Sequence, residues 1–269
     1  TCRDWAHLWL NEGFASYYTI LYEEQKLGTD AMKYSLWLEA QEVFGANDTR
    51  PIVWRDYGDP MQQFDNRAYP KGAWVLHMLR SQLGPDLFRK CMKTYLDRHR
   101  NGIVSTDDLQ NVVEEVSGLS FDQFFDQWLY HGGVPELKVD HAWDSNAKLA
   151  KITVRQTQKL SEQVRLFRVP LPASFKVAGQ KEPIRFTMDV SKEVEDFHFT
   201  LPAQPELVRI DPDFTVLAKI SFTPPGPMLD KQLESDLIGR LLAVRTLDRK
   251  HIAKLGQILR EDKFHAVRS

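Results

Sequence analysis

Residues 7–18 read HLWLNEGFASYY and place one carboxylate, Glu12, among large apolar side chains. We expect this stretch to lie in a helix that runs from near Leu10 to Leu27 and stops at Gly28, because glycine commonly follows helix ends. A carboxylate among apolar groups is costly to bury unless a positive group holds it. Glu12 therefore either points to water or has a partner, which is an arginine, a lysine or a metal ion.

Composition is that of an ordinary globular protein and excludes several functional classes. Of 269 residues, 42% are hydrophobic and 27% are charged, and the net charge of −2 lacks the basic excess of a nucleic-acid binder. No run of about 18 apolar residues is present, so we predict no membrane span in this segment. Cys2 and Cys91 form neither a disulfide framework nor a CxxC metal site, and the localisation stays unknown.

The two ends of the sequence predict an internal piece of a longer protein. The first residue is Thr1 rather than methionine, and the last residues, DKFHAVRS, follow no turn signal. The absence of a targeting segment therefore says nothing about where the protein is found.

Helical periodicity extends through residues 1–133. After the first helix, we expect helices over residues 30–44, 70–83, 85–101, 107–117 and 121–131. The predicted N-terminal signals are Asn11, Thr29, Pro70, Thr106 and a capping box of Ser120 with Gln123. A loop rich in proline, glycine and aspartate fills residues 46–68, with a short extended piece over 52–54.

After Gly133 the apolar period changes from near 3.6 to 2, which is typical of strands. Several short strands with turn signals between them predict a β-sandwich over residues 137–222. A TPPGP linker at 223–227 precedes amphipathic helices over 229–247, 251–262 and, partly, 262–269. Their pairing predicts the start of a HEAT-like helical repeat domain over 223–269. The predicted fold is therefore a multidomain α and β protein, with a helical domain over residues 1–136.

Three common catalytic signatures are absent from the sequence. There is no phosphate-binding G-x-x-x-x-G-K-[ST] loop, no G-x-S-x-G nucleophile elbow and no G-x-G-x-x-G dinucleotide motif. Chemistry in this chain then has to come from acids, histidines and tyrosines.

Four segments in order along the chain resemble the zinc aminopeptidases related to aminopeptidase N, in the gluzincin group. WLNEGFASY at 9–17 resembles that family's third-ligand segment, and YPKGA at 69–73 resembles its Tyr-x-Lys-Gly-Ala segment. FFDQWLYHGGVPEL at 124–137 resembles the close of its catalytic domain, and VRIDPDF at 208–214 resembles the end of its β-sandwich. The resemblance implies that residues 1–136 are the C-terminal helical part of a thermolysin-like catalytic domain.

The resemblance implies a Zn²⁺ site in which Glu12 is one metal ligand. In the family, two histidines of an H-E-x-x-H helix and one later glutamate hold zinc, so the histidine ligands are expected upstream of Thr1. None of the eight histidines is followed by glutamate. His7 is five residues from Glu12, which is off the same helix face, so we do not expect it to be a ligand. From spacing alone, a solvated Glu12 or a buried Glu–Arg pair is the simpler interpretation.

Tyr69 is the candidate catalytic residue. Pro70 disfavours helical dihedrals before it, so we expect Tyr69 at or just before a helix N-terminus. The resemblance implies that its hydroxyl stabilises the oxyanion formed when metal-activated water attacks a peptide carbonyl. The pattern alone favours a core tyrosine bonded to backbone. Gly72 is expected to allow close helix packing, and neither Lys71 nor Gly72 receives a chemical role.

The function implied is part of a zinc-dependent metallo-aminopeptidase that removes N-terminal residues from peptide substrates. The isolated chain is predicted to be inactive, because two metal ligands, the general-base glutamate and the family's amine-binding Gly-x-Met-Glu-Asn segment are missing from it. Two alternatives stay open: a catalytically dead relative acting as a protein-interaction scaffold, and the branch of the family that also hydrolyses epoxides. Residue specificity and oligomeric state are not indicated.

Overall fold

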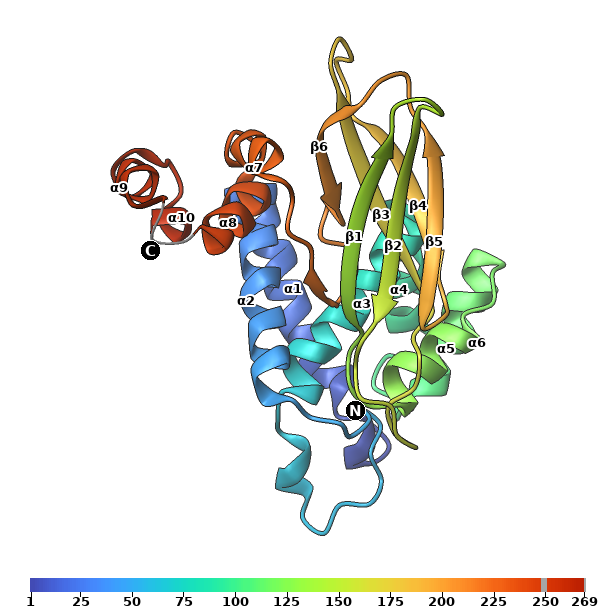
Figure 1. Cartoon of the computed structure of the whole chain (residues 1–269). Helices are drawn as coiled ribbons and strands as arrows, with labels where there is room; N and C mark the ends of the chain where they lie inside the picture. Colours follow the sequence, from blue (N-terminus) through green and yellow to red (C-terminus); the bar gives the residue numbers. More distant parts are fainter. Residues whose placement is uncertain (248–250, 269) are drawn as a thin grey trace. The chain divides into compact units, whose positions relative to one another are not determined.

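The computed structural model describes residues 1–247 and 251–268 and is helical up to Tyr130 (Figure 1). Contacts divide the chain into two units. One unit is Thr1–Pro135 with Gln158–Phe167, and the other is Glu136–Thr157 with Arg168–Ser269. Among the described residues, no helix is both long and apolar enough to cross a membrane.

The first unit is built from helices that follow the predicted order. Its elements are η1 (Trp5–His7), α1 (Trp9–Leu27), α2 (Thr29–Ala46), η2 (Pro60–Gln63), η3 (Arg67–Lys71), α3 (Gly72–Leu83), α4 (Pro85–Arg98), α5 (Thr106–Ser117), α6 (Asp122–Phe125) and η4 (Asp126–Tyr130). Helix α1 packs against α2, α3 and η3, so it lies at the centre of the unit. Its core contains the fully buried rings of Trp9, Tyr17, Trp74 and Trp128.

Several predicted helix starts are wrong. Asn11 lies within the first turn of α1 and is exposed, and Thr29 is the first residue of α2 rather than its cap. At α5 the capping box is formed by Ser105 with Asp108, one residue before the predicted Thr106. The predicted box at Ser120 is absent, because α6 starts after Phe121 with no side-chain cap. Hydroxyl and amide residues crowd these boundaries, and the sequence does not show which of them caps the helix.

The pair Gly132–Gly133 joins three parts of the first unit. A Cβ atom on Gly132 would lie 1.6 Å from the carbonyl oxygen of Thr49, and Gly133 has a φ of +73° with Val164 packed against it. The Gly132 amide also donates to the carbonyl of Gln163 at 2.8 Å. The loop after α2 and residues 158–167 therefore both pack on this glycine pair.

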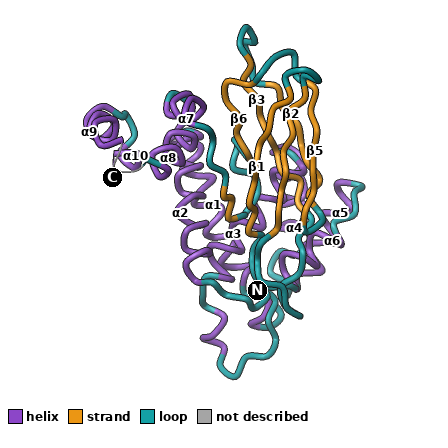
Figure 2. Tube along the Cα trace, in the orientation of Figure 1, coloured by secondary structure: helices purple, strands orange, loops and turns teal. Residues whose placement is uncertain are grey.

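The second unit contains two sheets. The four-stranded sheet has the order β5-β2-β1-β7, and the three-stranded sheet has the order β4-β3-β6. Figure 2 draws the strand segments in orange. The strands are β1 (Glu136–Asp144), β2 (Leu149–Gln156), β3 (Val169–Val177), β4 (Ile184–Val190), β5 (Val194–Thr200), β6 (Pro205–Ile210) and β7 (Lys219–Ser221). All pairings are antiparallel except that of β1 with β7. Phe199 of β5 lies 5.4 Å from Phe175 and 4.5 Å from Phe186 between ring centroids, so the two sheets meet through aromatic side chains.

Within residues 222–247 and 251–268, the described part of the chain after the strands, the helices are α7 (Gly226–Leu233), α8 (Leu237–Thr246), α9 (Ile252–Glu261) and α10 (His265–Arg268). The predicted single helix over 229–247 is wrong, because it breaks between Leu233 and Leu237. Asp236 causes the break, since its carboxylate accepts a hydrogen bond from the Gly239 amide and caps α8. Ser269, the end of the last predicted helix, lies outside the described residues.

Candidate active site

Two glycines bring α1 and the turn before α3 into backbone contact. A Cβ on Gly13 would lie 2.9 Å from the carbonyl carbon of Gly72 and 3.2 Å from the carbonyl oxygen of Ala68. A Cβ on Gly72 would lie 3.1 Å from the Cα of Gly13. Only glycine permits backbones to approach this closely. The expectation that Gly72 allows close packing is confirmed, and each glycine follows a segment that carries a candidate site residue.

This close approach joins Glu12 and Tyr69. The Tyr69 hydroxyl lies close enough to the Glu12 carboxylate for the two groups to interact, and both side chains are partly exposed. Loss of solvent raises the pKa of Tyr69, and the negative charge and hydrogen bond of Glu12 raise it further. The phenol is therefore held protonated, as a donor requires.

Tyr69 lies inside the π-helical turn η3, so the predicted position before the helix is wrong. The reason lies at Pro70, which has no N–H to donate. The Lys71 amide instead donates to the Asn66 carbonyl at 3.0 Å, five residues back, and the Gly72 amide donates to the carbonyl of Arg67. Skipping the proline widens the turn from α to π without ending the helix. Single π turns inside helices occur frequently at functional sites.

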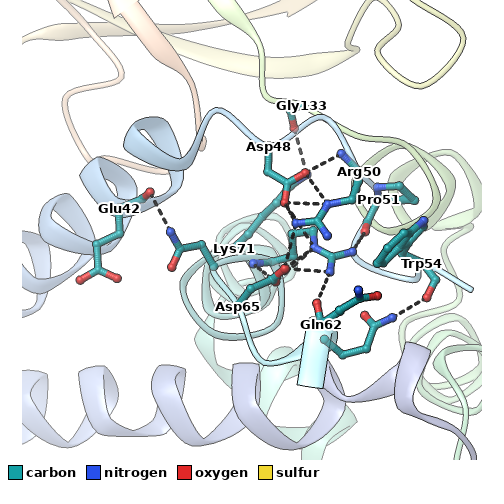
Figure 3. A network of polar contacts seen from close by, with 12 residues as sticks. Glu42, Asp48, Arg50, Pro51, Trp54, Gln62, Asp65, Lys71 and Gly133 are labelled. Atoms are coloured by element: carbon teal, nitrogen blue, oxygen red, sulfur yellow. Dashed lines mark hydrogen bonds and ion pairs between the residues drawn. The ribbon is translucent and has the colours of Figure 1, made fainter. Parts of the chain in front are cut away.

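Two cations on either side of Tyr69 are buried. Arg67 and Lys71 are each 3% exposed. The Lys71 ammonium donates to the carbonyl oxygen of Gly133 at 2.9 Å, a contact drawn in Figure 3. Burial lowers the pKa of Lys71 to about 8, although the charge of Asp48 partly opposes the shift.

The loop before Tyr69 contains two Asp-x-Arg turns of the same design. Asp48 accepts from the Arg50 amide at 2.8 Å, and Asp65 accepts from the Arg67 amide at 2.9 Å. In each turn the arginine Nε also donates to the same aspartate. Both guanidinium groups lie over the ring of Trp54, at 4.8 Å and 5.0 Å from its centroid. Burial raises the pKa of Asp48, but the hydrogen bonds from Arg50 outweigh it and leave that pKa below its usual value.

Sequence reasoning missed this cluster. From the sequence, Asp65 is only part of an aspartate-rich loop, and neither Arg67 nor Trp54 is predicted to have a role. The repeated Asp-x-Arg spacing is the sequence signal for this cluster. An aspartate side chain favours a turn in which it accepts a hydrogen bond from the backbone amide two residues later.

His7 is a buried structural histidine, 1% exposed. Its Nδ1 accepts from the Thr106 amide at 3.2 Å and lies 2.9 Å from the Thr106 hydroxyl, which also accepts from Trp9 Nε1. Burial lowers the pKa of His7. These contacts commit Nδ1 to the N-terminus of α5.

Glu12 is the residue whose chemistry fits a metal ion here. Carboxylate oxygens bind zinc, and the partly exposed Glu12 carboxylate is accessible for coordination. Across residues 1–247 and 251–268, no group of three or more His, Cys, Asp or Glu side chains is placed to hold a metal ion. The described chain thus supplies one donor of the set that the resemblance implies.

Comparisons with known proteins point to one family. Residues 1–128 match the Peptidase family M1 domain. The chain is 30% identical over 168 residues to Aminopeptidase M1 of Arabidopsis thaliana, a match that covers 60% of this chain and 18% of that protein. It is 27% identical over 233 residues to Aminopeptidase 2 of Candida albicans, covering 83% of this chain and 24% of that protein. The chain therefore spans less than a quarter of the length of these relatives.

A solved structure shares the fold. The crystal structure of Legionella pneumophila aminopeptidase A in complex with aspartic acid superposes with a TM-score of 0.78 at 18% identity, over 98% of this chain and 32% of that one. The fold and the ordered sequence matches agree. Residues 1–128 thus carry a Peptidase family M1 domain match, and the chain is related to the M1 aminopeptidases.

Proposed function

We propose that the chain is part of a zinc-dependent metallo-aminopeptidase that removes N-terminal residues from peptides. The observation that carries this proposal is the contact between Glu12 and Tyr69. These are the two residues that the family resemblance marks for metal binding and catalysis, and they come from segments far apart in the sequence. The aminopeptidase relatives support the same reaction class.

In the proposed site, Glu12 provides one carboxylate ligand, and the two histidine ligands and the general base come from an H-E-x-x-H segment upstream of Thr1. The chemistry that a bound zinc ion supplies is activation of water for attack on a peptide carbonyl. Tyr69 presents a protonated hydroxyl beside Glu12, where it donates to the carbonyl oxygen as negative charge develops. A donor that strengthens as charge develops lowers the barrier more than it tightens substrate binding.

The finer divisions of the chain belong to the same proposal. We assign residues 1–136 to the catalytic domain, 137–222 to a β-sandwich and 223–269 to the start of a HEAT-like repeat domain. Aromatic contacts between the two sheets support the second assignment. Contacts between α7 and α8, and between α10 and both α8 and α9, support the third.

A catalytically dead scaffold is the alternative function. A scaffold has no need for an acid and a phenol held in contact at a partly exposed position, so the Glu12–Tyr69 pair favours the enzyme. The sequence just before Thr1 separates the two, since an intact H-E-x-x-H indicates an enzyme and a broken one indicates a scaffold.

The role of Tyr69 is tested by kinetics on amino-acid anilides with the whole protein that carries this chain. Tyr69→Phe removes only the hydroxyl, and we expect kcat to fall by about 100-fold or more with KM changed little. Tyr18→Phe, at an exposed position of α1, is the matched control and should keep full activity. Wild-type kcat in Tyr69→Phe would contradict the proposed role. The chain of residues 1–269 alone should show no turnover, and chelator-sensitive hydrolysis by it would overturn that expectation.

A further inference from the structure

Arg67 and Lys71 are buried on either side of Tyr69, two residues before it and two after it. Buried cations are unfavourable unless their hydrogen bonds are met, so their retention at this turn calls for an explanation. We propose that Arg67 and Lys71 are positioning residues that fix the π turn and thereby hold the Tyr69 hydroxyl against Glu12. The expected effect on catalysis rests on the proposed function. The structural claim, that these two cations fix the position of the Tyr69 side chain, does not depend on that function.

Arg67 fixes the start of the turn through hydrogen bonds to three groups and a contact with one aromatic ring. Its Nε donates to Asp65 at 2.8 Å, and its two terminal nitrogens donate to the carbonyls of Pro51 at 3.0 Å and Gln62 at 2.8 Å. Its guanidinium plane lies over Trp54. The planar fork of arginine suits this arrangement, because several acceptors are met at once in a fixed geometry. The turn is thereby tied to both ends of the loop that precedes it.

Lys71 fixes the end of the turn. Its ammonium reaches the carbonyl of Gly133, and the neighbouring Gly132 lies directly against Thr49. The same loop also contacts η4, just before the glycine pair, because the Val53 amide donates to the Leu129 carbonyl at 2.8 Å. Figure 3 shows Lys71, Gly133, Asp48 and Arg50 converging on this point. Both cations therefore tie η3 to the same region of backbone.

Neither cation contacts the Tyr69 hydroxyl among the hydrogen bonds of the described residues, so any effect on it passes through the backbone of the turn. A π turn is less regular than an α turn, and Pro70 removes one of its amides. Precise placement of a catalytic group depends on the residues that support it, and a misplacement of about 1 Å can reduce a rate by about 100-fold.

The structural part is tested by NMR of the chain labelled at the tyrosine ζ-carbon. The chain has eight tyrosines, and the Tyr69 resonance is assigned by its loss in Tyr69→Phe. In Lys71→Met, which keeps the apolar stem, we expect the Tyr69 resonance to shift as its bond to Glu12 loosens. The matched control is Leu109→Ala, a core truncation in α5, which should leave that resonance in place. An unchanged Tyr69 resonance in Lys71→Met overturns the inference.

A second variant covers the case in which Lys71→Met does not fold. Arg67→Lys keeps the charge but loses the fork, and it should shift the same resonance. A Tyr69 resonance that stays in place in Arg67→Lys overturns the inference equally.

The catalytic part is tested by a double-mutant cycle in the whole protein. Lys71→Met alone should lower kcat by about 10-fold with KM within about twofold. In a Tyr69→Phe background the same change should lower kcat by less than about twofold, because its target is gone. An equal loss in both backgrounds contradicts positioning through Tyr69. Full activity of Tyr69→Phe contradicts the proposed function instead, and the NMR shift then still decides the structural part.

Discussion

Buried charges in the two units find their partners in opposite ways. Asp211, after β6, accepts from the amides of Thr215 and Val216 and from the Thr215 hydroxyl, all within five residues. Lys71 reaches Gly133, 62 residues away, and Arg67 reaches Pro51 across 16 residues. The contacts of Asp211, here called the local cluster, shape one turn. The contacts of Arg67 and Lys71, here called the long-range cluster, hold distant segments together around a candidate catalytic tyrosine.

The largest effect is expected from Gly132→Ala, because Gly132 makes the closest backbone contact beside the long-range cluster. The new methyl group would lie 1.6 Å from the Thr49 carbonyl oxygen, so the backbone has to move. We expect the chain to lose about 3–5 kcal/mol of unfolding free energy in urea denaturation. Gly45→Ala is the matched control, since open space surrounds that position in α2 and the change should be neutral or slightly stabilising. A similar stability for both variants would show that the junction tolerates rearrangement.

A smaller effect is expected from the titration of Lys71. Because its pKa is lowered from 10.5 to about 8 in the folded chain, the unfolded chain binds more protons between these values. Unfolding free energy should therefore gain about 3 kcal/mol from this residue as pH rises from 8 to 10.5, and lose it as pH falls back. Lys71→Met should remove this contribution. Parallel pH profiles of the two proteins in urea denaturation would show that Lys71 is not desolvated.

The smallest effect is expected at the local cluster. Asp211→Ala leaves the partly buried amide of Thr215 and the buried amide of Val216 without their acceptor. We expect a loss of about 2 kcal/mol in unfolding free energy, with the Tyr69 resonance unchanged because the cluster serves only its own turn. If Asp211→Ala moved the Tyr69 resonance as Lys71→Met does, the distinction between local and long-range clusters would fail.

Helices and strands were predictable because apolar periodicity records burial directly. The alternation of Leu137, Val139 and His141 places β1 correctly, and Gly28 and Gly84 mark the ends of α1 and α3 with positive φ angles. Boundaries were less predictable. The sequence contains several plausible caps near each helix start, and only the folded backbone selects Ser105 over Thr106. The burial of single aromatic residues in a helix was equally hard to predict, since Trp74 is fully buried whereas Tyr18 is 43% exposed.

The candidate site was predictable only in part. Glu12 and Tyr69 were identified through family resemblance, and their roles stay predictions. Their contact depends on Gly13 and Gly72 meeting across two helices, which no local pattern records. The π turn was not predicted, because a proline usually disfavours helical dihedrals in the residue before it. Here the Lys71 amide donates to the Asn66 carbonyl, which Pro70 leaves without a donor, and the helical turn continues. The role of Arg67 was not predicted, because two of its acceptors are backbone carbonyls and the sequence does not indicate which carbonyls a side chain will reach.

The most direct test of the metal assignment to Glu12 is elemental analysis of the whole protein and its Glu12→Gln variant after dialysis. We predict about one zinc ion per wild-type molecule. Glu12→Gln should lose most of the zinc, together with peptidase activity, while its urea unfolding curve stays close to that of the metal-free wild type. A wild-type protein without bound metal, or a Glu12→Gln variant that keeps both zinc and activity, would contradict the account.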